Sequence, residues 1–562
     1  MSLVPEIEVR PHVLQTPSES PECGSIVKDS ASTNSGGSLE ADQEFLQRQY
    51  ALAQLDQTQR VNWGMIKQLT VCGVAFLNDA YDMFAINIVA MILGFVYYHD
   101  APGAAQNTVP KKWDTLIKIA VQIGCLLGQL VLGRLGDKIG RTTVYAASLM
   151  IAIITTIASA FANSMVRGIN VFVVLFIWRV LLGFGIGGDY PLTAAIVSEY
   201  SRTENRGKLM AGVFAWQGFG NVLAPLVSLI VTVCFAAKID SDVLYLDYVW
   251  RIIIGVGCIP GVATLYWRLR MTDSSRFQNV AAAGNPEAAE SLGSEDEKLL
   301  ATDAGSMASA DEPSGLSEQR GQPADSSRRG RRKTFRQYFG EWRHLKVLLG
   351  TSIAWFALDV AFYGINLNGA VVIDAIGFAG DLYTDKPSQF IIRNCLGNII
   401  INILGSVPGY WITVFTIERL GRKTIQLMGF AVLTVLYVIL GFAYSQILAK
   451  SSGAFIFLFS LAQLFQNFGP NVTTFVIPGE VFPTRFRATA HGISAAAGKL
   501  GAIVAQGGLL QLTDIGGKHA WIDHLLQVFA LFMFVGFVVT FWIPESKGRS
   551  LEEICDESEE YF

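Results

Sequence analysis

Six ionisable side chains lie inside long apolar stretches of this 562-residue sequence. A charged group inside such a stretch costs roughly 2.5–3.5 kcal/mol on membrane-insertion scales, so each of these residues is a functional candidate by default. Carboxyl groups can carry protons and basic groups can bind anions, so the set predicts ion binding and proton transfer. Its members are Asp79, Asp82, Arg179, Asp189, Asp359 and Lys499.

Asp79 and Asp82 are three residues apart, so they share one face of a helix. Two ionised carboxylates repel each other in a medium of low dielectric constant, and one of the pair is then expected to hold a proton near neutral pH. The spacing therefore predicts a proton relay. The alternative is a carboxylate pair that sits in water at the end of a helix.

Trp355, Asp359 and Tyr363 recur every four residues and form one stripe on a helix. The indole N–H and the phenol O–H are hydrogen-bond donors, and a protonated Asp359 would add a third. Three donors in a row suit an oxyanion. An aromatic packing stripe is the alternative, and the aspartate at its centre favours the binding interpretation.

Three uncharged side chains are further candidates for ligand contacts. Tyr190 follows Asp189 and a pair of glycines, which allow another backbone to approach closely. Asn471 follows a Gly-Pro pair, where a broken helix can expose polar backbone groups to a site. Gln217 lies in an apolar run, where it either contacts a ligand or bonds to another helix.

Lys499 lies within the string AAAGKLGA, whose small residues leave its side chain room to reach a partner. It can serve as the cation for a carboxylate or for a bound anion. Arg179 is expected to make a structural bond between helices instead.

The elements that carry these residues are membrane-spanning helices. Only 16% of the residues are charged, against roughly 25% in soluble proteins. A helix that crosses a membrane needs about 20 mostly apolar residues. Twelve segments meet this requirement and predict an all-α membrane protein, with spans at about 65–95, 115–135, 143–165, 171–198, 209–237, 248–269, 346–375, 391–416, 424–447, 453–479, 489–513 and 523–544.

Polar segments flank and divide these spans. Loops after even-numbered spans hold clusters of Lys and Arg, which predicts that both termini and the middle loop face the cytoplasm. The expected organisation begins with a disordered N-tail at 1–64 and a first six-helix half at 65–270. A middle loop at 271–345, a second six-helix half at 346–544 and an acidic C-tail at 545–562 follow.

The two halves repeat at an offset of about 281 residues, with Asp79 and Asp359 one residue out of that register. The matching charged residues fall at the cytoplasmic ends of spans. They are expected to form ion pairs that close the cytoplasmic side in an outward-open state. These gating residues are Asp137, Arg141, Glu199 and Arg206 in the first half and Glu418, Arg422, Glu480 and Arg487 in the second.

Several classes of protein are excluded by what the sequence lacks. It contains no P-loop, no zinc-ligand spacing and no nucleophile elbow, so we expect no enzyme, no cofactor and no metal. Seven cysteines in 562 residues are too few for a disulfide scaffold. The net charge of −4 argues against binding of nucleic acid.

Longer strings carry a resemblance. GRLGDKIGR at 133–141 and Arg179-x-x-x-Gly183 resemble motifs of the major facilitator superfamily. The strings LNDAYDMF at 77–84, GGDYPLTAAIVSEY at 187–200 and FGPNVTTFVIPGEVFPTRFRATAHGISAAAGKLGAI at 468–503 resemble the phosphate:proton symporter family of fungi and plants. The likeness covers most of 65–544 except the middle loop. It implies the major facilitator fold and proton-coupled uptake of inorganic phosphate across the plasma membrane.

The resemblance implies a role for Lys499 as the cation for a carboxylate or phosphate, and the residues themselves suggest roles for the other candidates. Asp79 and Asp82 would relay protons, while Asp189 and Asp359 would bridge binding to protonation. Asp189 would be the partner of Lys499 in the empty carrier. The expected phosphate ligands are Tyr190, Gln217, Trp355, Asp359, Tyr363, Asn471 and Lys499.

Other interpretations stay open. Some fungal relatives carry a glutamate in span 3 where this sequence has Ser148, which implies fewer proton sites or a dispensable glutamate. A proton-coupled glycerophosphodiester transporter of the same family is one alternative, and a phosphate-binding receptor that signals through its tails is another. The run from Glu295 to Leu300 resembles an acidic dileucine sorting signal, which would recruit endocytic or regulatory factors to the cytoplasmic loop. The other expected partners are phosphate, protons and the lipid bilayer.

Overall fold

The computed structural model describes residues 63–101, 106–163, 170–274, 277–278, 333–367, 373, 378, 380–382, 384–513, 515 and 521–555. Within these ranges the chain is helical apart from its turns and short connections. Almost all of the predicted N-tail, most of the middle loop with its dileucine-like run, and the last seven residues lie outside the described residues.

The first half is built from long helices joined by short turns. The sixth predicted span is divided at Gly257 into α7 and α8. Residues deep in these helices are mostly apolar or small, which allows helices to approach closely in lipid. The helices are α2 (Trp63–Tyr97), α3 (Lys111–Ile139), α4 (Arg141–Ala160), α5 (Val171–Tyr200), α6 (Arg206–Ser241), α7 (Leu246–Val256) and α8 (Cys258–Leu269).

The second half is more interrupted. Its eighth span is α14 (Pro387–Ile401), a π-helical turn at Asn402–Ser406 and α15 (Val407–Leu420). The other elements are α11 (Phe335–Tyr338), α12 (Trp342–Asn366), α16 (Arg422–Phe442), α17 (Tyr444–Lys450), α18 (Ser452–Gln466), the π-helical turn Asn467–Asn471, α19 (Val472–Val481), α20 (Arg487–Gly507), α21 (Ile522–Thr540) and α22 (Leu551–Cys555).

Within the described ranges, eleven segments are long and apolar enough to cross a membrane. The predicted span 453–479 is broken into α18, a π-helical turn and α19, with Phe468 at φ −80° and ψ 57°. Pro470 explains the break because it has no N–H to donate and its ring obstructs the preceding turn. Thr413 Oγ1 donates to the carbonyl of Asn467 at 3.1 Å, which satisfies one freed backbone group. With this broken helix, the described residues contain a helix, or a divided helix, at each of the twelve predicted spans, although α12 ends at Asn366, before the predicted end of its span at 375.

The internal repeat is visible in the backbone. Gly140 ends α3 with φ +123°, and its repeat partner Gly421 ends α15 with φ +92°. Both values favour glycine, because side chains with a Cβ rarely adopt positive φ. The same sharp turn therefore connects the second and third helices of each half, as the offset of 281 residues predicts.

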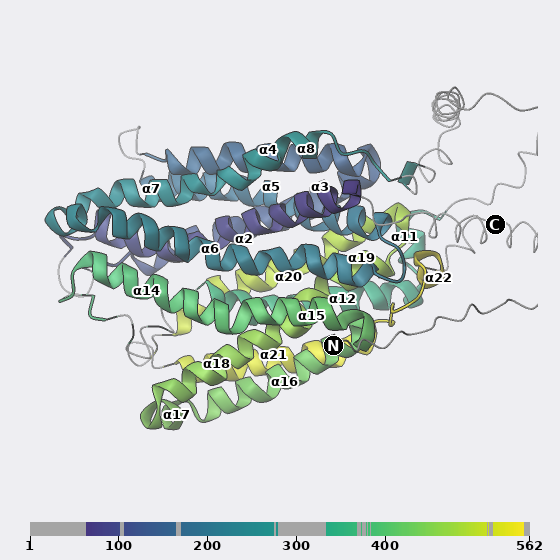
Figure 1. Cartoon of the computed structure of the whole chain (residues 1–562). Helices are drawn as coiled ribbons and strands as arrows, with labels where there is room; N and C mark the ends of the chain where they lie inside the picture. The colour runs from purple at the N-terminus through teal and green to yellow at the C-terminus, as the bar shows by residue number, and fades with distance from the viewer. Residues whose placement is uncertain are drawn as a thin grey trace, which may run out of the picture. The chain divides into compact units, whose positions relative to one another are not determined.

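The two halves pack along several helices. α20 packs along α3. α6 lies between α2 of its own half and α14 and α15 of the other (Figure 1). The candidate residues lie on these helices or on their immediate neighbours, so the fold brings both halves to one central polar cluster.

Candidate functional site

Lys499 is the centre of a polar cluster between α20 and α12. Its Nζ donates to Tyr363 Oη at 2.7 Å and to Asp359 Oδ2 at 3.2 Å. The side chains of Lys499 and Asp359 are each only 2% exposed, so water screens this ion pair little. A Cβ on Gly498 would lie 2.9 Å from Asp359 Oδ2, which explains the glycine beside the lysine. The predicted stripe on α12 thus faces Lys499.

Tyr190 joins this cluster from the first half of the chain. Lys499 Nζ lies 5.1 Å from the centre of the Tyr190 ring and 4.3 Å from that of Tyr363. The Tyr190 and Trp355 ring centres are 6.5 Å apart. The structure therefore places five of the seven predicted phosphate ligands together, with groups contributed by both halves.

The other two predicted ligands, Gln217 and Asn471, meet through a residue that sequence reasoning missed. Tyr410 Oη donates to Gln217 Oε1 at 3.2 Å and accepts from Asn471 Nδ2 at 2.7 Å. Phe214 connects this group to Tyr190, with ring centres 6.0 Å from Tyr410 and 6.3 Å from Tyr190. Tyr410 carries no charge and belongs to no motif that we identified, so its sequence context gave no signal.

The predicted contact between Asp189 and Lys499 is wrong. Asp189 Oδ1 instead forms an ion pair with Arg268 Nη2 and accepts a hydrogen bond from Ser148 Oγ at 2.6 Å. Arg268 also lies over the ring of Tyr145, 3.2 Å from its centre. The sequence concealed Arg268 because it stands near the end of a predicted span, where basic residues usually mark the cytoplasmic side. Arg268 therefore joins the six candidate residues, so that this set has four carboxylates and three basic groups, apart from the ion pairs at the helix ends.

Asp79 and Asp82 are both buried but have different surroundings. Asp82 Oδ2 accepts from Asn78 Nδ2 at 3.2 Å and from Thr156 Oγ1 at 3.3 Å. Arg179 Nη2 donates to the carbonyl of Asp82 at 3.1 Å, which is the structural bond between helices that the sequence predicted. Oδ2 of Asp79 is buried and has no hydrogen-bond partner among the described residues.

The gating residues form two matching clusters at one end of the helices. In the first, Glu199 at the end of α5 pairs with Arg141 of its own half and with Arg487 of the other half, the latter at 2.9 Å. Ser274 Oγ donates to Glu199 Oε2 at 2.6 Å. Asp137 accepts the backbone N–H of Thr489 at 2.7 Å, a second link between the halves.

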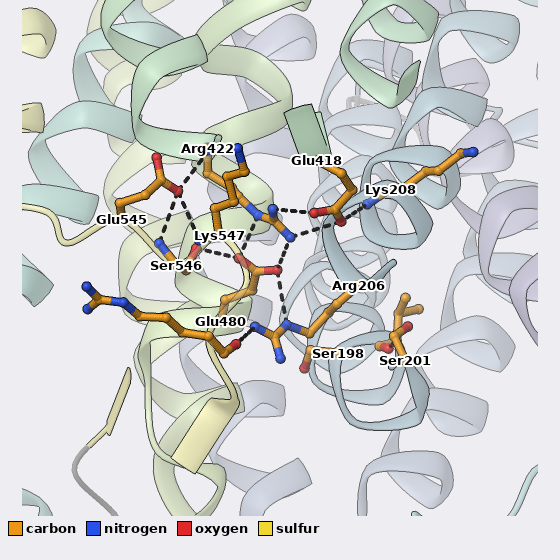
Figure 2. A network of polar contacts seen from close by, with 12 residues as sticks. Ser198, Ser201, Arg206, Lys208, Glu418, Arg422, Glu480, Glu545, Ser546 and Lys547 are labelled. Atoms are coloured by element: carbon orange, nitrogen blue, oxygen red, sulfur yellow. Dashed lines mark hydrogen bonds and ion pairs between the residues drawn. The ribbon is translucent and has the colours of Figure 1, made fainter. Parts of the chain in front are cut away.

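The second cluster repeats this arrangement around Glu480 at the end of α19 (Figure 2). Glu480 pairs with Arg422 of its own half at 3.0 Å and with Arg206 of the other half at 3.1 Å. Ser546 Oγ donates to Glu480 Oε2 at 2.5 Å, as Ser274 does in the first cluster. Glu418 accepts the backbone N–H of Lys208 at 2.9 Å and pairs with Arg422 at 2.6 Å.

Two carboxylates that were not predicted from the sequence accept backbone N–H groups next to these clusters, at the starts of α4 and α16. Asp273 Oδ1 accepts the backbone N–H groups of Arg141 and Thr142 at 3.1 and 2.9 Å. Glu545 does the same for Arg422 and Lys423, both at 3.0 Å. The acid–serine pairs Asp273-Ser274 and Glu545-Ser546 are 272 residues apart, so a search at the offset of 281 does not find them.

These features define a class: a multi-pass membrane carrier of two repeated halves, with ionisable groups buried between them and ion pairs that join them at one end. A model of the family "Sugar (and other) transporter" matches residues 69–557, and the chain belongs to this family. The protein is a transporter of the major facilitator fold and not an enzyme.

Its similarity to known proteins extends over most of the chain. The repressible high-affinity phosphate permease of Neurospora crassa is 37% identical over 539 residues, which cover 91% of this chain and 89% of that one. The inorganic phosphate transporter PHO84 of Saccharomyces cerevisiae is 39% identical over 531 residues, which cover 90% of this chain and 86% of that one.

A solved structure of the proton:xylose symporter XylE is similar in fold. It superposes with a TM-score of 0.63 at 18% sequence identity, and the match covers 87% of this chain and 98% of that one.

Proposed function

We propose that this protein takes up inorganic phosphate together with protons across the plasma membrane by alternating access. The observation that carries the proposal is the position of Lys499, with hydrogen bonds to Asp359 and Tyr363 and with Tyr190 of the other half over it. The phosphate permeases that cover about nine-tenths of this chain support phosphate as the substrate.

In this proposal the polar cluster between the halves binds the phosphate oxygens. Lys499 supplies the positive charge, and the phenol, indole and amide groups around it supply hydrogen bonds. Both halves then contact the substrate, so its binding favours closure of the halves around it. The ligands are Tyr190, Gln217, Trp355, Asp359, Tyr363, Asn471 and Lys499.

The charges of the buried groups make protons a requirement for binding. With four carboxylates and three basic groups ionised, the region carries a net negative charge that repels an anion. Protonation of Asp359 frees Lys499 for phosphate and adds a donor. Asp79, whose Oδ2 has no partner among the described residues, is the carboxyl group that we assign to receive a proton first, with Asp82 next in the relay.

The membrane potential sets a further condition. Inward movement of a phosphate monoanion against an inside-negative potential costs about 2.3 kcal/mol per 100 mV. More than one proton must therefore enter with each monoanion for the potential to drive uptake. Asp189, next to Tyr190 and paired with Arg268, would connect the bound phosphate to these protonation steps.

The clusters around Glu199 and Glu480 would act as the cytoplasmic gate. The basic residues in the loops favour an orientation with both termini and the middle loop in the cytoplasm. The gate pairs would then hold the cytoplasmic side closed while the site is open to the outside, and they would separate when the carrier turns inward. Regulatory factors that recognise the middle loop remain part of this proposal.

Phosphate uptake into proteoliposomes under an imposed pH gradient tests the function. We expect radiolabelled phosphate to accumulate only when the outside is acidic, and Asp359→Asn to abolish this coupled uptake. Asp114→Asn, which removes a partly exposed surface pair with Lys118, should transport normally and serves as the control. Entry that ignores the gradient would exclude symport. Stronger competition by glycerophosphocholine or glycerophosphoinositol than by phosphate would point to the phosphodiester alternative.

A further inference from the structure

A cavity lies at the end of the second half that carries the Glu480 cluster, outside the central polar cluster. It has a volume of about 340 Å³, at the lower end of the range for small-ligand sites. The first turns of α12 and α16, the end of α19 and residues 541–544 enclose it, together with Tyr338 of α11 and Ile554 of α22. The proposed phosphate pathway makes no use of this cavity.

The cavity is positively charged. Arg343, Lys346 and Lys423 line it, and none of the described lining residues is Asp or Glu. Two acidic residues lie nearby. Glu341 pairs with Lys333 at 2.8 Å and lies 3.6 Å from His344 Nε2, which lines the cavity, and Glu545 accepts the backbone N–H groups at the start of α16. An anion in the cavity would therefore meet three basic side chains and no carboxylate among the described residues that line it.

Exposed aromatic rings border the cavity on its outer side. Trp342, Phe541 and Trp542 are 63%, 56% and 41% exposed, and the two indoles pack edge to face with ring centres 6.4 Å apart. Tryptophan gathers where a membrane protein crosses from the hydrocarbon to the headgroup layer. Exposed rings of this kind are expected at headgroup depth, and two of them, Phe541 and Trp542, line the cavity.

We propose that this cavity binds the headgroup of an anionic phospholipid with a phosphomonoester, such as a phosphoinositide. A phosphomonoester carries about −1.5 to −2 charges near neutral pH. Arg343 can bind it through two parallel N–H groups, and the lysines can bind it as point charges. The inference rests on the proposed orientation, which turns this end toward the cytoplasmic leaflet, where anionic lipids concentrate.

The site would also contact the gate through Lys423. Its side chain lines the cavity and its backbone N–H donates to Glu545 Oε2 at 3.0 Å. Ser546, which follows Glu545 in the sequence, donates a hydrogen bond to Glu480 in the second gating cluster. A headgroup held by Lys423 would therefore stabilise the segment that closes the second cluster.

Lipid binding to the purified full-length protein in detergent tests the site. Dioctanoyl phosphatidylinositol 4-phosphate is titrated and followed by native mass spectrometry, with dioctanoyl phosphatidylcholine as the neutral comparison. Each basic residue near an anionic headgroup contributes roughly fivefold to binding. We expect Arg343→Gln/Lys346→Gln/Lys423→Gln to weaken binding about 100-fold, and Lys346→Gln alone about fivefold, which keeps the test usable if the triple variant does not fold.

The control variant removes the same charge at the corresponding end of the first half. Arg134, Lys138 and Arg270 are exposed there, and their simultaneous change to Gln should alter binding less than twofold. Equal losses in both triple variants, or equal binding of the phosphatidylcholine, would overturn the proposal. If free inositol phosphates bind as tightly as the lipid, the proposal is also overturned, because the cavity would then bind a soluble ligand. The assay measures no transport, so its failure leaves the proposed uptake untouched.

Discussion

The ion pair between Arg268 and Asp189 offers the sharpest test of the structure, since the sequence pointed to a different partner. Arg268→Gln removes the cation and leaves Asp189 with its hydrogen bond from Ser148. The glutamine keeps most of the side-chain volume, so the change is mainly electrostatic. An isolated carboxylate is then left between packed helices.

The burial of the pair sets the size of the effect. The side chains of Arg268 and Asp189 are 1% and 4% exposed, so the modest values of about 0–1 kcal/mol measured for surface pairs do not apply. Removal of one partner from a buried pair typically costs about 3–5 kcal/mol, because the remaining charge is uncompensated. We expect Arg268→Gln and Asp189→Asn each to lose about 3 kcal/mol of unfolding free energy.

A double-mutant cycle separates this pairing from general damage. Free energies of unfolding are measured for the purified protein in mixed detergent micelles at neutral pH. Arg268→Gln/Asp189→Asn replaces the ion pair by two neutral amides and should recover much of the loss, with a coupling energy of at least about 2 kcal/mol. The parallel cycle of Asp189→Asn with Lys499→Gln should be additive within about 0.5 kcal/mol, since these residues do not share an ion pair.

The reasoning fails if the effects of Arg268→Gln and Asp189→Asn are additive. It fails equally if the coupling is found between Asp189 and Lys499, as the sequence alone suggested. Low pH provides a second check, because an unpaired buried carboxylate avoids its cost by binding a proton. The instability of Arg268→Gln should therefore shrink on acidification, while that of Asp189→Asn should not.

Two further predictions concern the gate and the helix packing. Glu480→Gln should cost about 3–5 kcal/mol and reduce uptake, because the buried Arg206 loses its ion pair and Arg422 keeps only Glu418. Glu418→Gln, whose side chain is 22% exposed, should cost less than about 1 kcal/mol. Thermal melting and uptake assays compare the two variants. Gly188→Ala should cost about 1–3 kcal/mol, because its Cβ would lie 3.1 Å from Ser148 Cβ between α5 and α4. A Cβ at Gly212 would have nothing within 4 Å, so Gly212→Ala should leave the melting temperature unchanged or slightly raised. A similar loss of stability in both glycine variants would contradict the packing argument.

Hydropathy and the repeat predicted most of the fold. The twelve spans follow from apolar length, because a bilayer requires each crossing to satisfy its own backbone hydrogen bonds. The eight charged residues at the helix ends were predicted from the repeat and from the placement of charge, and the structure puts each of them in an ion pair. The repeat made this possible, since one cluster predicts the other.

The partners of the buried charges could not be predicted in the same way. Which carboxylate meets which base depends on how helices rotate about their axes, and α8 turns Arg268 toward Asp189. The pairing of Lys499 with Asp359 instead of Asp189 has the same origin. Tyr410 was missed because a phenol does not fix its surroundings by its type, whereas the Gly-Pro pair before Asn471 did predict a broken helix there.

The helices themselves connect the central cluster to the gate. α5 carries Tyr190 and Glu199, and α20 carries Lys499 and Arg487, so the pair Glu199–Arg487 joins the two helices that face each other across Lys499. At 1.5 Å per residue, Lys499 lies about 18 Å along α20 from Arg487. A helix transmits a tilt over this distance without bending much. In the proposed mechanism, phosphate bound between Lys499 and Tyr190 would pull on the same two helices that the pair Glu199–Arg487 joins, and the strength of that pair would set how much binding energy is needed to separate them.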